Sequence, residues 1–467
     1  MLDTKTIHHA IDSRQDKLTA VSDQIWDYAE TRFQEEHSAE RLCMALEEEG
    51  FTVERGTGGI ETAFMGSYGS GHPVIALLGE YDALSGLSQQ AGVAAEQPLV
   101  PGGNGHGCGH NLLGTGSLAA AIAVKDYMQQ HGLTGTVRYY GCPAEEGGSG
   151  KTFMARAGVF DDVDSAVTWH PFDYHSVMSV NTLANYQFYY KFKGRSAHAA
   201  AAPHMGRSAL DAVELMNIGV NYLREHIIQE ARIHYAVTDT GGRSPNVVQA
   251  SAEVLYLIRA PHVHEAAEVV ERVHDIARGA AMMSGTKVEI VFDKACSEIV
   301  PNRTLEQVML EQFGQFPVPV HTQDELELAA AVRETLTEPE KRLAQKLPLS
   351  QRDRSLASEV LPYEHGQMLY GSTDVADVSW ITPTVQCTTA CFAIGTSAHS
   401  WQWVSLGRTS IGHKGMLYAG KIMAATAVQL LLQPELLQSA RNELNERLDG
   451  QPYQCPIPAE VQPALQR

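Results

Sequence analysis

Residues 73–79 read Pro-Val-Ile-Ala-Leu-Leu-Gly, and residues 136–141 read Thr-Val-Arg-Tyr-Tyr-Gly. Both are short apolar runs that end in a turn, which is typical of buried strands. Between them, residues 112–128 are small and apolar over the length of a helix. The order strand, helix, strand predicts an α/β fold in which buried strands run parallel.

The chain on either side of this unit shows two other hydrophobic patterns. The first 50 residues have the spacing of amphipathic surface helices. Residues 185–296 alternate strand-like and helical segments in the order β-α-β-β-α-β, which is typical of a ferredoxin-like unit. We therefore expect a mixed-sheet α/β domain built from residues 1–184 and 297–467, with residues 185–296 inserted as a second domain.

Composition excludes several classes of protein. The chain has 467 residues, of which 44% are hydrophobic and 19% are charged, as in ordinary globular proteins. A formal charge of −20 repels nucleic acid and anionic lipid, so we expect neither a nucleic-acid partner nor a membrane. We see no run of about 20 apolar residues, and the N-terminus lacks the apolar core of a secretory signal. Seven cysteines, an odd number, favour reduced thiols and a cytoplasmic protein.

The loop at residues 105–111 is the strongest chemical signal. It reads Gly-His-Gly-Cys-Gly-His-Asn, and places the thiol of Cys108 and the imidazole of His110 two residues apart. Such a pair can converge on one metal ion. The alternative interpretation is a glycine-shaped turn beside a buried thiol.

A pair of carboxylates supports the metal interpretation. Glu145 and Glu146 follow a predicted strand, where open α/β sheets place their ligands. Adjacent carboxylates repel unless cations offset their charge, so one can bind metal while its neighbour accepts a proton. A solvated acidic turn is the alternative.

Histidines further along the chain could complete the centre. His170 follows an apolar stretch, although a histidine there is more often a satisfied core residue. His399 closes a segment rich in glycine and threonine, and His413 opens a long predicted helix. Either of these two could be the distant ligand.

Three candidates lie in the inserted unit. His198 follows its first strand and is surrounded by small residues, and Asn246 lies in a Ser-Pro-Asn turn. Arg259 ends an apolar strand, where a guanidinium suits a substrate carboxylate through bidentate bonding. A surface salt bridge is the alternative for Arg259.

Taken together, these segments resemble the dinuclear-metal amidohydrolases of the aminoacylase and carboxypeptidase type, a group of metallopeptidases. The resemblance covers nearly the whole chain. Its carriers are GEYDAL (79–84), GHGCGHNLLGTG (105–116), PAEEGGSGKTFM (143–154), TWHP (168–171), SAHAAAAPHMGRSALDA (196–212), SPNVVQA (244–250), LIRAP (257–261), GSTDVADVSW (371–380) and GRTSIGHKGM (407–416).

The resemblance implies two divalent metal ions, Mn²⁺ or Zn²⁺, and a set of site residues. Glu145 would act as general base and acid, His198 would come from a partner's lid to stabilise the oxyanion, and Asn246 and Arg259 would hold the substrate. Many relatives take a ligand from a His-x-Asp sequence, but this chain has Glu80-Tyr81-Asp82. Asp82 is therefore expected to orient a ligand. The implied ligands are Cys108, His110, Glu146, His170 and His399.

The implied reaction is hydrolysis of the amide bond of an N-acyl amino acid. The resemblance suggests p-aminobenzoyl-glutamate as that substrate. The inserted unit would be a lid and dimerisation domain, in a homodimer or in a heterodimer with a related A subunit. A broader activity on indole-acetyl or aryl-acyl amino acids is one alternative. A thiol hydrolase with Cys108 as nucleophile and His110 as base is another, and a non-catalytic partner chain is the third.

Overall fold

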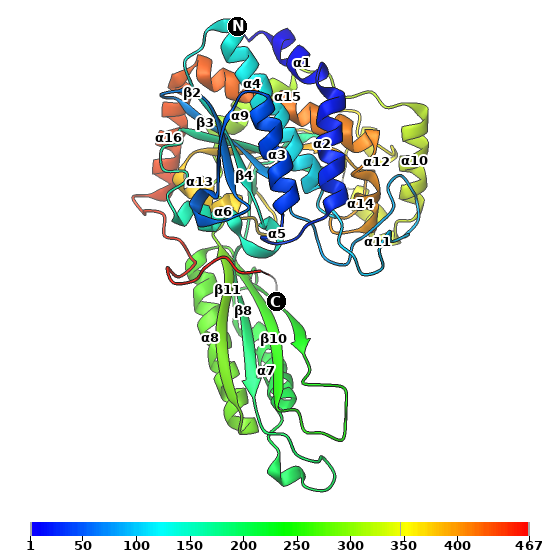
Figure 1. Cartoon of the computed structure of the whole chain (residues 1–467), viewed down its shortest axis with the longest axis vertical. Coiled ribbons are helices and arrows are strands. Elements are labelled where there is room, and N and C mark those ends of the chain that lie inside the picture. Colours follow the sequence, from blue (N-terminus) through cyan, green and yellow to red (C-terminus); the bar gives the residue numbers. More distant parts are fainter. Residues whose placement is uncertain (1, 346, 466–467) are drawn as a thin grey trace.

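The computed structural model describes residues 2–345 and 347–465, which form a large body and an elongated projection (Figure 1). A seven-stranded mixed sheet lies at the centre of the body, in the order β1-β2-β4-β3-β5-β13-β6. Strands β3, β4, β5 and β13 run parallel to their neighbours in this group, and the outer strands run antiparallel. The strands are β1 (Thr52–Arg55), β2 (Phe64–Ser70), β3 (Val74–Glu80), β4 (Gly135–Cys142), β5 (Ser165–Phe172), β6 (Ser176–Val177) and β13 (Thr384–Ala390).

Helices cover both faces of this sheet, because its central strands are apolar on both sides. One face packs against the larger hydrophobic core, and the other packs against a smaller cluster that includes α6 and α13. The strand, helix, strand order predicted around residues 73–141 is confirmed. The helices of the larger core include α1 (Thr4–Asp12), α2 (Gln15–Tyr28), α3 (Glu36–Glu48), α4 (His110–His131), α9 (Arg303–Phe313), α15 (Ser410–Leu432) and α16 (Pro434–Leu448).

One helix corrects the expectation that the chain has no stretch of membrane-spanning length and composition. Helix α15 has 23 residues and is apolar enough to cross a bilayer by those criteria, but 83% of its most apolar window is buried inside the protein. It packs between α4, α9 and the sheet. Its apolar character is explained by its position in the core.

The remaining elements of the body are short. Residues 317–364, predicted only as a polar stretch with prolines, contain three helices. The described tail, residues 450–465, has neither helix nor strand. The short elements are α5 (Glu145–Gly148), α6 (Gly150–Arg156), β7 (Val180–Asn181), α10 (Gln323–Glu334), α11 (Glu338–Ala344), α12 (Leu349–Arg352), β12 (Gln367–Met368), α13 (Val375–Ile381) and α14 (Trp401–Leu406).

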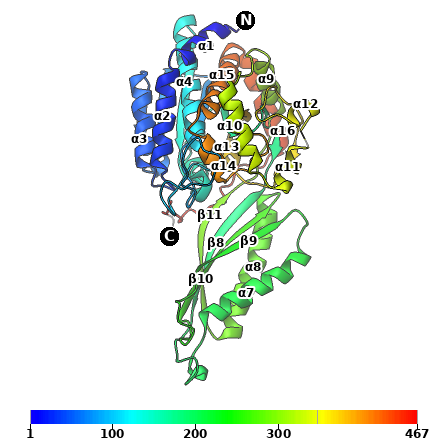
Figure 2. The same cartoon turned by 90° about the vertical axis from the view of Figure 1, so that its right-hand side faces the viewer.

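The projection contains a second sheet with its own hydrophobic core. Its four strands lie in the order β11-β8-β10-β9, and α7 and α8 pack against the sheet, as Figure 2 shows. Along the chain the elements are β8 (Ala184–Lys193), α7 (Ala209–Leu223), β9 (Arg232–Asp239), β10 (Ser251–Ala260), α8 (Val263–Ser284) and β11 (Lys287–Cys296). This is the order of elements that the sequence predicts.

A β-bulge marks the root of the projection, where β11 returns to the body. The register of β11 against β8 shifts between Phe292 and Lys294, so Asp293 is an extra residue in the ladder. Bulges re-aim side chains, often next to active sites. Here the buried carboxylate of Asp293 accepts two hydrogen bonds from Arg32, at 2.9 and 3.1 Å. The next residue, Lys294, donates a hydrogen bond of 2.8 Å to the carbonyl of Glu146 in the body.

Candidate functional site

The five ligand candidates come from the ends of several elements of the body. Cys108 precedes α4 and His110 begins it, Glu146 lies in α5 just after β4, and His170 lies near the end of β5. His399 lies in the loop before α14. Open α/β sheets place ligands at the carboxyl ends of their strands, and this cluster follows that rule.

Local backbone conformation aims these side chains. Gly109 has a φ of 74°, and a Cβ atom there would lie 2.8 Å from the ring of Pro171, so only glycine fits between the two ligands. Ala144 and Ser149, both with a φ of 57°, bracket the short helix α5. His399 has a φ of 61°, and such left-handed residues cluster at functional sites.

Two groups of three potential ligands share one thiol. The ligand atoms of Cys108, His110 and His170 lie within 4.8 Å of one another, and so do those of Cys108, Glu146 and His399. Nε2 of His170 is 3.4 Å from Sγ of Cys108, and Nε2 of His399 is 3.1 Å from Oε1 of Glu146. The structure thus brings all five predicted ligands together.

The donor set fits two divalent cations. Nε2 of His110 and Oε1 of Glu146 are buried and make no well-formed hydrogen bond to a described residue; their neighbours are Oε2 of Glu80, 3.3 Å from His110, and Nε2 of His399, 3.1 Å from Glu146. Buried polar atoms are rarely left without a partner, so each of these atoms suits a metal ion. Thiolate and imidazole favour zinc, and carboxylate with imidazole also suits manganese.

Other side chains orient the candidate ligands from behind. Oδ1 of Asp82 lies 2.9 Å from Nδ1 of His110, and its Oδ2 accepts a 2.9 Å hydrogen bond from the backbone of Glu146. Nδ1 of His170 lies 2.8 Å from the carbonyl of Pro171. Each imidazole therefore turns Nε2 toward the cluster, and the expectation that Asp82 orients a ligand agrees with this geometry.

The electrostatics of the cluster favour ionised ligands. Burial and the carboxylate of Glu146 raise the pKa of Cys108, but His170 and His110 oppose them and lower it to about 6. Burial also raises the pKa of Glu146, and its contact with His399 lowers that pKa to about 2. Bonding to Cys108 and Glu146 raises the pKa of His399 to about 11. Without a metal, the imidazole of His399 thus carries the positive charge beside Cys108 and Glu146, and it must release its proton to bind a cation.

Glu145 lies in a different electrostatic environment from its neighbour. Burial raises its pKa well above the usual value, and the charges of Glu80, Glu146 and Asp374 raise it further. A carboxyl group with a raised pKa can accept and return a proton near neutral pH. The two adjacent carboxylates thus differ in the way that a ligand and a proton carrier should differ.

A buried ion network beside Glu145 was missed by sequence reasoning. Nζ of Lys151 lies 2.7 Å from Glu80 and 2.5 Å from Asp374, and all three side chains are buried. Glu80 also forms a group of possible ligands with His110 and Glu145. Because Lys151 already neutralises Glu80, a cation is not required there. The sequence could have indicated this network, because Lys151 and Asp374 are charged residues within family motifs whose other residues are mostly small or apolar.

Glu35 was also missed. Its buried carboxylate accepts hydrogen bonds from the backbone of Ala144, at 3.0 Å, and from the hydroxyl of Thr62, at 3.2 Å. It therefore supports the residue that precedes Glu145. Nothing in its local sequence, Gln-Glu-Glu, distinguishes it from a surface residue.

The three candidates in the projection are not together. His198 and Asn246 are neighbours, because His198 bridges to Val247 and the carbonyl of Asn246 accepts a 3.0 Å hydrogen bond from Ala199. Both lie in loops beyond the far ends of β8 and β10 (Figure 1). Arg259 lies at the opposite end of β10, about 26 Å along the strand from Ser251 at about 3.3 Å per residue.

Arg259 lies at the end of the projection that is nearer to Glu145 and Glu146. Burial lowers the pKa of its guanidinium, and the charges of Cys296, Glu145 and Glu146 oppose that shift. His198 is exposed at the distant tip. One chain therefore supplies the ligands, Glu145 and Arg259 in one place, and His198 with Asn246 in another.

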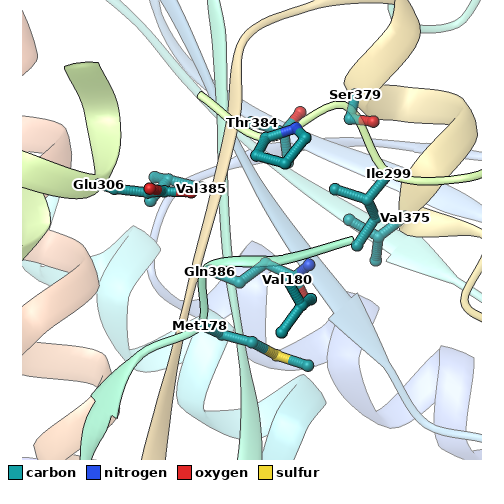
Figure 3. A pocket seen from close by; sticks show the side chains of 10 residues that line it. Met178, Val180, Ile299, Glu306, Val375, Ser379, Thr384, Val385 and Gln386 are labelled. Atoms are coloured by element: carbon teal, nitrogen blue, oxygen red, sulfur yellow. The ribbon is translucent and has the colours of Figure 1, made fainter. Parts of the chain in front are cut away.

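A small pocket elsewhere in the body contains none of these residues (Figure 3). It lies around the start of β13, and Glu306 is one of its walls. Oε2 of Glu306 is held by Tyr363 and His365, at 2.5 and 2.9 Å. Its lining residues are Met178, Val180, Ile299, Pro301, Glu306, Val375, Ser379, Thr384, Val385 and Gln386.

Comparison with known proteins agrees with the resemblance seen in the sequence. The chain is 55% identical over 471 residues to the B subunit of p-aminobenzoyl-glutamate hydrolase from Escherichia coli (strain K12), covering 98% of each chain. It is 33% identical to the A subunit of the hydrolase from that organism, over 46% of this chain and 51% of that protein. Among solved structures, a dinuclear metal binding peptidase of the M20 family from Bacillus subtilis matches with a TM-score of 0.55 and 18% identity, covering 90% of this chain and 99% of that one.

The family model of peptidase family M20/M25/M40 matches residues 76–399, a range that contains all of the candidate ligands and the whole projection. The match extends over more than half of the chain. Together with the full-length relative from Escherichia coli, it identifies the fold and the hydrolase class. The chain belongs to peptidase family M20/M25/M40.

Proposed function

We propose that this chain is a dinuclear metal-dependent amidohydrolase that cleaves p-aminobenzoyl-glutamate to p-aminobenzoate and glutamate. The observation that carries this proposal is the thiol of Cys108, shared by two groups of potential ligands. The name of the Escherichia coli relative, which matches over nearly the whole chain, supports the choice of substrate.

The ligands in this proposal are Cys108, His110, Glu146, His170 and His399, and the ions are Mn²⁺ or Zn²⁺. When bound, two such cations would lower the pKa of the attacking water and polarise the scissile carbonyl. Asp82 would keep His110 and the backbone of Glu146 in place, through the hydrogen bonds described above.

Glu145 would move the proton. It accepts one proton from the attacking water while the oxygen of that water bonds to the amide carbon. It then returns the proton to the amide nitrogen as the carbon–nitrogen bond breaks, so glutamate leaves with a neutral amine. Its burial and raised pKa support this double role.

The remaining groups would come from the projection, which we propose to be a lid and dimerisation domain of residues 185–296 between two parts of a catalytic domain, residues 1–184 and 297–467. Arg259 of the same chain would bind the substrate carboxylate. His198 and Asn246 would come from a partner's lid, with His198 stabilising the oxyanion. Their position at the far end of β10 from Arg259 supports this division.

The partner would be a second copy of the chain or a related A subunit. The two Escherichia coli relatives are named as the B and A subunits of one hydrolase, which supports a heteromeric assembly. Strand β9 lies at the edge of the lid sheet, and most of its residues are exposed. Exposed edge strands readily pair with another chain.

We also infer a cytoplasmic location. All seven cysteines are free, and five of those outside the metal cluster are buried. Free thiols persist in reducing compartments. The net charge of −20 argues against a nucleic-acid or membrane partner.

Release of glutamate from p-aminobenzoyl-glutamate tests the proposal. The purified chain is assayed after chelation and again after Mn²⁺ or Zn²⁺ is added back, with and without the A subunit. Cys108→Ser is compared with Cys43→Ser, which changes a buried cysteine of helix α3 outside the cluster. We expect activity that depends on metal, and a loss of metal and activity only in Cys108→Ser.

Three results would contradict this function. Activity that survives chelation but is lost on thiol alkylation would support a Cys108 nucleophile with His110 as its base. If the chain hydrolyses indole-acetyl or other aryl-acyl amino acids faster than p-aminobenzoyl-glutamate, the broader amidohydrolase would be supported. A chain that binds no metal and hydrolyses neither substrate, even when the A subunit is present, would be a non-catalytic partner.

A further inference from the structure

Two arginines face each other across the lid sheet. Arg259 of β10 and Arg232 of β9 are directly opposite in the antiparallel register. The pair next to them, Ile258 and Ile233, is buried in the core of the lid. Because side chains alternate along a strand, both arginines project from the face that the lid helices do not cover. Like charges directly opposite each other destabilise a sheet unless something offsets them.

No carboxylate of the described residues forms an ion pair with either guanidinium. Arg232 donates to the carbonyls of Gln229 and Ala231, at 2.6 and 2.8 Å, and lies 5.0 Å from the centre of the Tyr370 ring. Arg259 donates to the carbonyl of Tyr370 at 3.5 Å. Lys191, elsewhere on the same sheet, has the usual arrangement, with a carboxylate of Glu253 at 3.0 Å.

Unsatisfied polar atoms lie on the Arg259 side of the pair. Nε of Arg259 is buried without a hydrogen-bond partner among the described residues. Asn185 of β8 is opposite Arg259 on its other side, and its Oδ1 is buried in the same unpartnered state. Polar atoms in this state suit a ligand that bonds to them. The arginines therefore form a positive site that the described part of the chain leaves uncompensated.

This site lies next to the catalytic residues. Lys294, two residue pairs further along the same sheet, donates to the carbonyl of Glu146 at 2.8 Å. The charges of Glu145 and Glu146 reach Arg259. A substrate whose amide lies at Glu145 can therefore place its amino-acid portion toward the two arginines.

We propose that Arg232 and Arg259 form a paired subsite that selects a dicarboxylic amino acid as the leaving group. Arg259 binds the α-carboxylate and Arg232 binds the side-chain carboxylate. Opposite residues in an antiparallel sheet have Cβ atoms about 4.5–5.5 Å apart, so two guanidinium groups there can engage both ends of one short amino acid. This inference rests on the proposed amide hydrolysis and adds the residue that determines the specificity.

The stacking of Arg232 on Tyr370 gives the subsite a fixed geometry. A guanidinium held over an aromatic ring keeps its edge free for a carboxylate. Both of the Arg232 hydrogen bonds described above go to backbone carbonyls, which add no negative charge that would neutralise the guanidinium. Arg232 is thus held in place and still carries a charge available to a ligand.

The test compares p-aminobenzoyl conjugates of glutamate and glutamine, which differ by one side-chain carboxylate. Arg232→Gln should lower kcat/KM for the glutamate conjugate by about 10-fold to 100-fold, the usual range for a lost charged hydrogen bond. It should leave kcat/KM for the glutamine conjugate within about twofold. Arg278→Gln is the matched control, because Arg278 is an exposed lid cation that pairs with Asp275. Thermal unfolding of each variant shows whether its fold is intact.

Calorimetric binding of free L-glutamate and L-glutamine supplies a second measurement. Glutamate binding that weakens in Arg232→Gln but not in Arg278→Gln supports the subsite. Equal kcat/KM for the two conjugates in the unaltered enzyme, or equal losses in Arg232→Gln, overturns the subsite and leaves the proposed function standing. If the enzyme hydrolyses neither conjugate, the proposed function fails. Glutamate binding then still decides the subsite, which is rejected if binding is absent or unchanged in Arg232→Gln.

Discussion

The candidate metal-binding cluster in the body and the tip of the projection are built in opposite ways. Cys108 and His110 are buried, and further buried groups such as Asp82 hold their neighbours in place. His198 is exposed, and it contacts backbone groups of its own loop and of Val247. The body thus brings the candidate ligands together, whereas the tip of the projection carries His198 and Asn246 far from that cluster.

Because of this difference, substitutions in the two regions should have different effects. Substitutions in the body should change chemistry or metal binding within one chain. Substitutions at the lid tip should change the chemistry of a neighbouring chain.

The largest effect is expected at Glu145. Glu145→Ala removes the proton carrier, and general acid–base catalysis typically contributes about 10²-fold to 10⁴-fold, so turnover should fall by at least that range. Metal content should be unchanged, because Glu145 is not among the proposed ligands. Turnover is measured by glutamate release, and bound metal by elemental analysis after dialysis. Normal activity in this variant would break the mechanism.

The next effect tests the lid. His198→Ala should lower turnover by about 100-fold or more, the usual loss of an oxyanion donor. Mixing this variant with Glu145→Ala under conditions that exchange subunits should restore activity, because one mixed site has both groups intact. His226→Ala, which changes an exposed lid histidine outside the strands, is the control. Absence of recovery in verified mixed dimers would show that His198 acts within its own chain.

A smaller effect, on metal affinity, is expected at Asp82, which contacts a candidate ligand. Asp82→Asn weakens the contact with Nδ1 of His110, and loss of such a partner commonly lowers metal affinity by about tenfold to a hundredfold. Competition with a chromogenic chelator measures that affinity. Asp377→Asn alters another buried carboxylate of the body and should leave metal affinity unchanged. An affinity equal to that of the unaltered protein would remove Asp82 from the centre.

The smallest effect concerns the stability of the body. His175 is buried, and its Nδ1 accepts a 3.1 Å hydrogen bond from the backbone of Ala390. Burial and then His321 lower its pKa to about 3. Since the folded pKa lies below the unfolded value of 6.5, this stabilisation is complete above pH 6.5 and is lost as the pH falls toward 3.

Denaturant unfolding at pH 7 and pH 5 measures this dependence. The difference in unfolding free energy between the two pH values should be smaller in His175→Gln than in the unaltered protein, by about 2 kcal/mol. His226→Gln in the exposed part of the lid should not alter the difference. An identical pH dependence in His175→Gln would show that the buried imidazole is not responsible.

The same comparison explains what sequence could predict. Hydrophobic rhythm located β3, α4, β4 and the strands of the lid, because their periodicity reflects which side chains are buried. Cys108, His110 and the pair Glu145 and Glu146 became candidates because glycine-rich motifs place thiol, imidazole and carboxylate groups where few other residue types occur, and the resemblance to a family added His170. The resemblance to a family then chose between His399 and His413. His399 joins the cluster, whereas Nε2 of His413 lies 2.8 Å from Asp23 on the surface of the body.

The sequence could not predict which side chains pair when they lie far apart along the chain. Lys151 and Asp374 are 223 positions apart, and Arg32 and Asp293 are 261 apart. Arg232 and Arg259 are opposite each other because of the register between β9 and β10, and the sequence of one strand alone does not reveal that register. The expectation that no stretch has membrane-spanning length and composition failed at α15 for a related reason, because the elements that pack on this helix decide its environment.

The bulge at Asp293 makes the root of the lid intolerant of changes in chain length. Loops such as residues 94–103 lie at the surface and can gain or lose residues at little cost. At the root, one residue more or fewer would reverse the facing of every following side chain in β11. Lys294 would then turn away from the carbonyl of Glu146, and Asp293 from Arg32. Evolution can therefore substitute residues in this strand, but insertions and deletions there should be absent from functional members of the family.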